Sequence, residues 1–202
     1  MLFYLTFVAS YFLFSCKCFY YDVIINKDPK QTQNNIEIYY KALPVVLKNV
    51  CIYTIPFFIY LDYIYEPRPF SIIGSSLAVI VTKYGSNIVF YGVHKYFHDN
   101  KDLYKYHKVH HEFKEPLGIL AAYSHPIDFI FGNFIPFAIV PILLKTNTLT
   151  MLYLIVHGNY NTIKIDHNTP NTKNNHHILH HLHFNYNYGE MWIDKYMNTL
   201  KT

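Results

Sequence analysis

The chain has 202 residues, of which 51% are apolar and only 15% are charged, and its formal net charge is +4. This length fits one domain or one membrane unit, and so few charges argue against an ordinary soluble domain. Three cysteines are too few for a disulfide framework or a cysteine-based zinc site. The basic residues lie among histidines without a DNA- or RNA-binding motif, so we expect no nucleic-acid partner.

The first 42 residues predict an N-terminal apolar anchor followed by a polar loop. Residues 1–14 are apolar but short, and they fit a signal-like anchor, an interfacial helix or a first membrane span. Residues 22–41 are polar and predict a loop or a short helix. We therefore separate an N-terminal unit, residues 1–42, from a membrane domain over residues 43–202.

Two apolar stretches predict a membrane hairpin. Residues 43–65 form the first convincing span, and residues 70–93 form the second, which only Lys83 interrupts. Between them, residues 65–69 contain two prolines around a charge, a pattern that ends a helix. The hairpin brings the residues after position 93 to one surface of the membrane.

The second half predicts a polar cap and further apolar segments. Residues 99–116 read as a surface helix, and residues 117–144 with 149–156 read as a second hairpin or as one span plus a re-entrant segment. Residues 168–175 predict a loop, and residues 176–202 a cytosolic tail. The whole is an all-α fold of membrane hairpins with a helical cap, which the lysines place on the cytosolic side.

All thirteen histidines lie between His94 and His183, and most fall into three boxes. The boxes are H-x3-H from His94, H-x2-HH from His107, and HH-x2-HH from His176. Residues three and four apart share a helix face, so three faces would present two, three and three imidazoles. Neutral imidazole binds iron, zinc and copper. One closed zinc site needs four ligands, so eight imidazoles predict a histidine-rich centre with two metal ions.

Carboxylates beside the boxes predict support for the ligands. Glu112, Asp166 and Asp194 are placed to accept the outer ring N–H of a ligating imidazole. His157 lies in an apolar stretch and fits a ligand, a proton carrier or a packed polar group. His176 and His183 flank the last box, and we expect neither to be a ligand.

The ordered boxes resemble the fatty acid hydroxylase / sterol desaturase superfamily of membrane-bound non-haem iron oxygenases. Within it, HKVHHEFKEPLG from His107, AYSHP from Ala122 and HHILHH from His176 resemble C-4 methylsterol oxidases most, over residues 87–199. The chain departs from the pattern after His167, where Asn-Thr-Pro replaces Ser-Gly-Tyr. Such departures bear on the substrate more than on the metal centre.

The resemblance implies a pair of non-haem iron ions, in whose place zinc could be found, and no catalytic side chain beyond the metal centre. The implied ligands are the eight box imidazoles and His167: His94, His98, His107, His110, His111, His167, His177, His180 and His181. His125 would orient the site from outside the ligand set. The implied partners are O2, a lipid or sterol, and cytochrome b5 or an NAD(P)H-dependent reductase as a separate electron donor, at the endoplasmic reticulum.

Several functions stay open. C-4 methylsterol oxidation leads, and fatty acid or sphingolipid hydroxylation and sterol desaturation are alternatives. A metal transporter would place its ligands inside the spans near the midplane, whereas these boxes lie in lysine-rich segments at span ends. An inactive, lipid-binding relative is a further possibility.

Overall fold

The computed structural model describes residues 1–66, 68–114, 116–167 and 176–202, and in these it is helical with no strand. The prediction of an all-α fold is confirmed. The α-helices are α1 (Leu2–Phe19), α2 (Pro29–Leu47), α3 (Ile55–Ile64), α4 (Ile72–Asp99), α5 (Lys101–His107), α6 (Ile135–Leu143), α7 (Thr148–Tyr160), α8 (His176–His183) and α9 (Met191–Tyr196). The π-helical segments are η1 (Tyr20–Ile25), η2 (Lys48–Tyr53), η5 (Asp128–Phe134) and η6 (Asn161–Asp166), and the 3-10 segments are η3 (His110–Glu112) and η4 (Gly118–Ala122).

Three helical stretches are long and apolar enough to cross a membrane: Leu2–Ile25, Pro29–Ile64 and Ile72–Asp99. A fourth apolar helix, Asp128–Leu143, is shorter. Helix α4 leaves large apolar side chains such as Ile73, Leu77 and Ile80 exposed, which fits contact with lipid. The chain is therefore an integral membrane protein, and its N-terminal apolar segment is a helix of spanning length.

The N-terminal polar segment, for which a loop or a short helix was predicted, contains the start of a long helix. Helix α2 starts at Pro29, inside the 22–41 stretch, and the helical path runs on to Ile64. Asp28 caps it by accepting from the backbone N–H groups of Lys30 (3.0 Å) and Gln31 (3.3 Å). Its polar sequence conceals a buried stripe at helical spacing, which includes Tyr39 and Ala42. Helices α1 and α2 share one core with Ile119 and Ile163, and the unit boundary at residue 42 stays a proposal.

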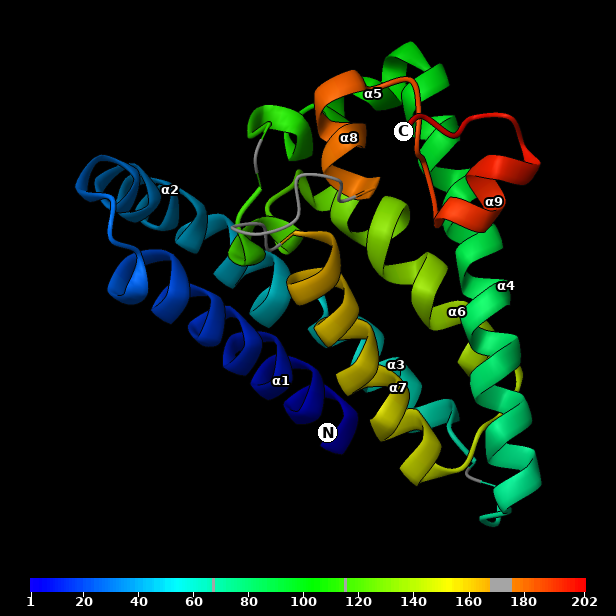
Figure 1. The fold of residues 1–202 in the computed structure, drawn as a ribbon. Helices are drawn as coiled ribbons and strands as arrows, with labels where there is room; N and C mark the ends of the chain where they lie inside the picture. The colour runs from blue at the N-terminus through cyan, green and yellow to red at the C-terminus, as the bar shows by residue number, and fades with distance from the viewer. Residues whose placement is uncertain (67, 115, 168–175) are drawn as a thin grey trace.

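The later apolar segments form a second hairpin. Helix α6 meets α7 through a turn whose last residue, Asn147, caps α7 by accepting from the N–H of Thr150 (3.0 Å). In Figure 1, α6 runs beside α4 and α7 beside α1, in agreement with the contacts between these pairs. The membrane part thus has two pairs of helices, which meet where α7 contacts α4 and α6.

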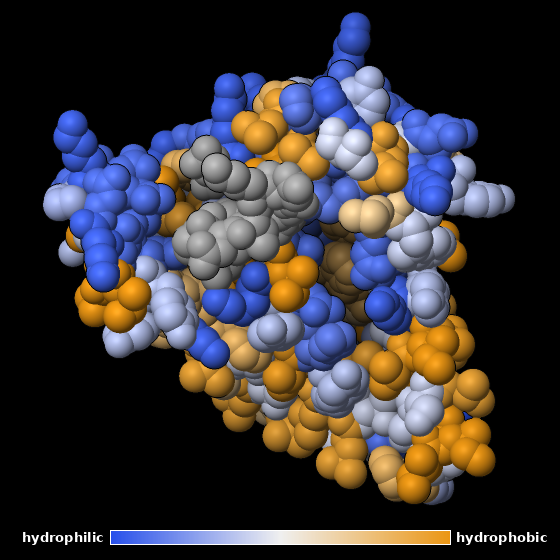
Figure 2. Space-filling model, in the orientation of Figure 1, coloured by the Kyte–Doolittle hydropathy of each residue, from blue (hydrophilic) through white to orange (hydrophobic). Residues whose placement is uncertain are grey.

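One end of the molecule, here called the histidine side, carries α5, α8 and α9 (Figure 1). Figure 2 shows that this end is mainly hydrophilic and the opposite end mainly hydrophobic. The surface helix predicted over residues 99–116 is shorter than expected, because α5 ends at His107 and a 3-10 turn follows. There the His110 ring and the Phe113 carbonyl bond to other segments, which bends the chain away from a helix. The predicted loop over residues 168–175 lies outside the described residues.

Side chains from two spans hold the segment that follows the second box. Tyr11 Oη donates to the carbonyl of Ile119 (2.9 Å) and accepts from the N–H of Ala122 (3.0 Å). Asn49 Nδ2 donates to the carbonyls of Ala122 (2.8 Å) and Ser124 (2.9 Å). Buried irregular backbone needs such partners, so α1 and η2 fix the path of η4 below the histidines.

Gly118 offers a test of this packing. A Cβ at Gly118 would lie 2.6 Å from Cys18 Sγ and 3.1 Å from Ile163 Cγ2. We expect Gly118→Ala to lower the free energy of unfolding by about 1–3 kcal/mol through overpacking. The measurement is the melting temperature of the detergent-solubilised protein.

Gly158→Ala is the matched control, because a Cβ at Gly158 in α7 meets nothing within 4 Å. This change should leave stability equal or raise it by about 0.5–1 kcal/mol. Equal melting temperatures for the two variants would contradict close packing at η4.

Candidate metal centre

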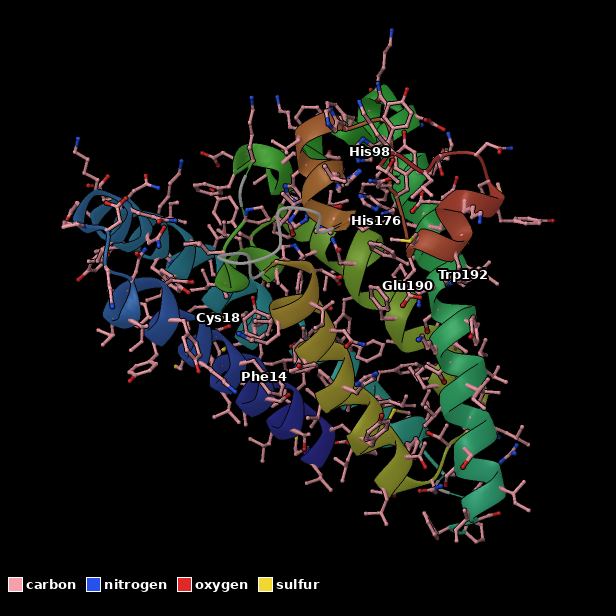
Figure 3. All side chains as sticks on the ribbon, in the orientation of Figure 1. Phe14, Cys18, His98, His176, Glu190 and Trp192 are labelled. Atoms are coloured by element: carbon pink, nitrogen blue, oxygen red, sulfur yellow. The ribbon has the colours of Figure 1, made fainter. Side chains whose placement is uncertain are left out.

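Nine imidazoles converge at the histidine side in two groups. The five-histidine group comprises His94, His98, His107, His111 and His180. The four-histidine group comprises His110, His167, His177 and His181. In each group the candidate ligand atoms all lie within 4.8 Å of one another. The structure thus brings together every residue that the resemblance implied as a ligand. One of them, His98, is labelled in Figure 3.

Each of the last two boxes divides between the groups. His107 and His111 join the five-histidine group, whereas His110 joins the other. In α8 the division is reversed: His177 and His181 join the four-histidine group and His180 the five-histidine group. The last two boxes therefore each contribute imidazoles to both groups. The two groups are in direct contact, because the ring of His111 in one and the ring of His181 in the other lie 4.6 Å apart between centroids.

Among the contacts between described residues, six of these rings donate their outward Nδ1–H to a fixed acceptor. Five acceptors are backbone carbonyls: Tyr188 for His94 (2.6 Å), Tyr123 for His110 (3.3 Å), Thr162 for His167 (2.7 Å), Tyr186 for His180 (2.7 Å) and Phe113 for His181 (3.0 Å). The sixth is the carboxylate of Asp128, which accepts from His107 (2.9 Å). A carbonyl oxygen can only accept, so each bond puts the proton on Nδ1 and leaves a lone pair on Nε2.

This tautomer explains why the groups fit a cation. His94 and His107 both carry their proton on Nδ1, yet their Nε2 atoms lie 3.1 Å apart. Two lone pairs at that distance repel each other unless a positive charge lies between them. The inward nitrogens are therefore arranged as metal ligands, and neutral imidazole is a ligand for iron, zinc and copper.

Burial keeps these rings neutral. It lowers the pKa of His110 to about 4 and, with the nearby His110, lowers the pKa of His167 to about 3. Burial also lowers the pKa of His177, His180 and His181 well below the usual range. Since a protonated imidazole cannot bind a metal through that nitrogen, these shifts favour the ligating form at neutral pH.

Asp128 is the residue that the sequence reasoning missed. Its side chain is fully buried, and its Oδ1 lies 2.9 Å from His107 Nδ1. Gly132 makes room for it, since a Cβ there would lie 2.4 Å from Asp128 Oδ1. A signal was present: Asp128 is the sole charged residue of the 117–144 stretch, and a charge in an apolar segment marks function by default.

Asp194 supports the centre through the backbone. Its carboxylate accepts from the N–H groups of Tyr188 and Gly189 (2.9 Å each) and from Thr199 Oγ1 (2.7 Å). It also accepts from Nε2 of His176 (2.8 Å), which thereby has a structural partner. Asp194 was expected to accept a hydrogen bond from a ligand ring. Instead it binds the backbone N–H groups of Tyr188 and Gly189, and the carbonyl of Tyr188 accepts from His94.

Glu112 and Asp166 also lie beside the groups. Glu112 pairs with Lys41 and accepts from the Tyr123 hydroxyl (2.6 Å), so it steadies the residue whose carbonyl accepts from His110. Asp166 precedes His167, and burial together with Glu190 raises the pKa of its carboxyl to about 7.

His125 and His157 lie outside both groups. His125 Nδ1 accepts from the N–H of Ile127 (3.2 Å), and its ring packs on Tyr106. The ring of His157 stacks on Tyr153, and its Nε2 bonds to Asn161 Nδ2 (3.2 Å). For His157 this arrangement supports the role of a packed polar group over those of a ligand or a proton carrier.

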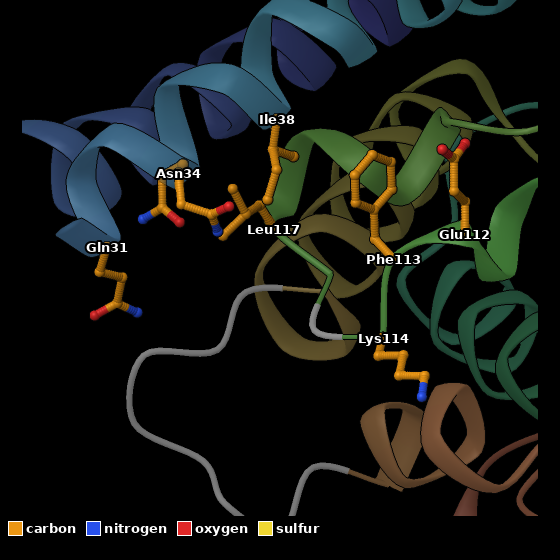
Figure 4. Close-up of a pocket in the computed structure, with 8 residues that line it drawn as sticks. Gln31, Asn34, Ile38, Glu112, Phe113, Lys114 and Leu117 are labelled. Atoms are coloured by element: carbon orange, nitrogen blue, oxygen red, sulfur yellow. The ribbon is translucent and has the colours of Figure 1, made fainter.

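A pocket of about 350 Å³ lies between α2 and the segment after His111 (Figure 4). It is lined by Gln31, Asn34, Asn35, Ile38, Glu112, Phe113, Lys114 and Leu117. Most of these side chains are polar or charged, so the lining does not match the apolar body of a lipid.

Comparison with known proteins places this centre in a family. The family model described as Fatty acid hydroxylase matches residues 76–199, which include all nine grouped histidines. Methylsterol monooxygenase 1 of Rattus norvegicus is 31% identical over 94% of this chain and 73% of its own length. Fatty acid hydroxylase ahd1 of Mycosarcoma maydis is 34% identical over 59% of this chain, and Delta(7)-sterol 5(6)-desaturase of Candida glabrata is 25% identical over 85%.

The coverage of these relatives is uneven. The match spans 33% of the Mycosarcoma maydis protein and 50% of the Candida glabrata protein. No solved structure matches the chain.

The bond between Asp128 and His107 yields a direct test. Asp128→Ala removes the acceptor that orients the ring, and we expect metal affinity to fall roughly 10- to 100-fold. The measurement is retained metal in the purified protein at graded concentrations of a competing chelator. Asp128→Asn keeps an acceptor oxygen at the same place and should lose less. Unchanged retention in a folded Asp128→Ala protein would show that the carboxylate does not orient His107.

Proposed function

This chain belongs to the fatty acid hydroxylase family, and on that basis we propose that it is a membrane-bound non-haem di-iron oxygenase acting on a lipid C–H bond. The observation that carries the proposal is the pair of adjacent all-imidazole groups at the end of spanning helix α4. One group supplies five inward nitrogens and the other four. Those nine residues are the proposed iron ligands.

Bound iron would supply the activation of O2 and the oxidation of an unactivated C–H bond. The chain's own residues present nine neutral donors, six of which are held in place by the outward hydrogen bonds described above. Aromatic rings shield them: Tyr188 lies 5.2 Å from His98, and Phe184 lies 5.1 Å from His111, between ring centroids. Zinc, which also prefers imidazole, could replace iron during purification.

Apolar contacts connect the membrane part to the centre. The ring of Phe90 stacks on Phe137 (4.8 Å between centroids) and lies against His94 (4.9 Å). Helices α4 and α6 thus reach the five-histidine group through aromatic side chains, without an intervening polar layer at this point. This supports a lipid whose apolar body stays within the bilayer while its reacting carbon meets the histidine side.

The leading substrate is a C-4 methylsterol. The support is the motif resemblance together with the rat methylsterol monooxygenase, whose similarity extends over 94% of this chain. Fatty acid or sphingolipid hydroxylation and sterol desaturation are the alternatives, and the named hydroxylase and desaturase relatives favour them.

Location and electron supply belong to the same proposal. The exposed Lys101, Lys105 and Lys108 lie on and after α5, which supports a cytosolic histidine side under the positive-inside rule. Electrons would come from cytochrome b5 or an NAD(P)H-dependent reductase, and the membrane would be the endoplasmic reticulum. A transporter is disfavoured, because the groups lie at the end of α4 rather than along the middle of the spans.

Metal content tests the centre. Protein purified under iron-replete conditions should carry about two iron ions per chain, one for each group. His167→Ala should lower the iron content by about half, since it depletes only the four-histidine group. His183→Ala is the control, because that ring is exposed and belongs to neither group. A wild-type protein with one metal ion or none would rule out the two-metal proposal.

Lipid profiling tests the reaction. Expression in cells that lack a C-4 methylsterol oxidase should restore demethylated sterols, and His110→Ala at equal membrane abundance should not. New hydroxylated fatty acids with unchanged 4-methylsterols would point instead to the alternative substrates. No lipid change from an iron-loaded, membrane-inserted protein would refute the oxygenase and leave the lipid-binding relative.

A further inference from the structure

Helix α9 has two different faces. Its inner face buries Ile193 and Asp194, which is the carboxylate that holds Tyr188 and Gly189. Its outer face exposes aromatic and sulfur-containing side chains: Trp192 is 37% exposed and Tyr196 is 81% exposed, with Met191 beside them. So many large exposed groups on a six-residue helix need a partner other than bulk water.

The outer face continues the lipid-facing surface of a spanning helix. The Trp192 ring lies edge-on against Tyr84 of α4, with 5.5 Å between centroids. Tyr84 belongs to an exposed stripe at helical spacing that includes Ile80 and Ile88, in a helix long and apolar enough to cross a membrane. Figure 3 places Trp192 beside α4, and in Figure 2 α9 lies near the boundary between the hydrophilic and hydrophobic ends.

Charges at α9 indicate how deep the helix lies in the bilayer. Trp192 Nε1 donates to the carboxylate of Glu190 (3.0 Å), and Lys195 follows on the exposed side. Such charges disfavour a position of α9 in the hydrocarbon core of the bilayer. The exposed Trp and Tyr side chains disfavour a position fully in water. Lys83, the single charge between residues 72 and 93, lies beside Tyr84 at the same level. Trp, Tyr and a long basic side chain together are typical of the membrane–water boundary.

We propose that α9 lies in the headgroup region of the leaflet on the histidine side, with Trp192 as its membrane anchor. The occupant of the outer face is the boundary between lipid headgroups and acyl chains. Because Asp194 is on the opposite face, the anchor holds the segment whose Tyr188 carbonyl accepts from His94. The metal-binding groups would thereby be fixed against the bilayer from which a lipid must come.

The chain carries its own probe, since Trp192 is its one tryptophan. The full-length protein is placed in phosphatidylcholine nanodiscs that contain lipids spin-labelled near the carbonyl end or near the methyl end of the acyl chain. An interfacial α9, about 5–10 Å into the headgroup boundary, should show about twofold stronger fluorescence quenching by the shallow label than by the deep one. Aqueous iodide should quench Trp192 weakly.

Two variants with a relocated tryptophan on α4 calibrate the depth scale. Trp192→Phe combined with Ile80→Trp places the probe on the exposed stripe of α4 below Tyr84, and the deep label should quench it best. Trp192→Phe combined with Tyr96→Trp places it near the end of α4, where iodide should quench it best. Trp192 should fall between them.

The other outcomes overturn the proposal. Strong iodide quenching of Trp192 without quenching by lipid labels would put α9 in water. Protection from both iodide and lipid labels would mean that another protein chain covers the outer face. Stronger quenching by the deep label would place α9 in the hydrocarbon core.

Discussion

The hydrogen bond from an outward Nδ1–H to a fixed oxygen is the interaction on which the rest of this structure depends. It selects the tautomer, aims the Nε2 lone pair inward and removes ring rotation. A carbonyl inside a regular helix is already used by the helix, so most acceptors come from irregular backbone. The segment around Phe113, the turn at Tyr123 and the stretch from Tyr186 to Tyr188 supply four of the five carbonyls. The loops of the cap are therefore part of the ligand support rather than simple connections.

This constraint gives the two halves of the chain different roles at the metal centre. The family match begins at residue 76 and includes every grouped histidine. Yet Tyr11 and Asn49, which lie before it, bond the backbone of the segment that leads to Tyr123. Tyr123 in turn accepts from His110. The N-terminal helices thus act on the four-histidine group at a distance, through backbone that they hold in place.

Local pattern in the sequence was enough for the helical class and for eight of the nine converging imidazoles, because residue spacing and ligand chemistry are local properties. The ninth, His167, followed only from the family resemblance. It was not enough for the division of the last two boxes between the two groups, which depends on how α5, α8 and η3 meet. Residues 22–41 were predicted as a loop or a short helix, and the length of α2 was underestimated because polar side chains outnumber the buried stripe around Tyr39. Asp128 was overlooked because its partner, His107, is 21 positions away and the bond exists only in the folded chain.

The level of Lys83 and Trp192 has a consequence for the surrounding bilayer. Twelve residues separate Ile72 from Tyr84, a rise of about 18 Å, against about 30 Å for a typical hydrocarbon core. If the proposed boundary at Tyr84 is correct, this lipid-facing height would create a hydrophobic mismatch, which a bilayer relieves by thinning locally. Thinning on the α4 side would bring acyl chains and sterol rings closer to His94 without movement of the protein. It would also favour residence in a thin membrane, so that the energy of bilayer deformation would contribute to the choice of membrane.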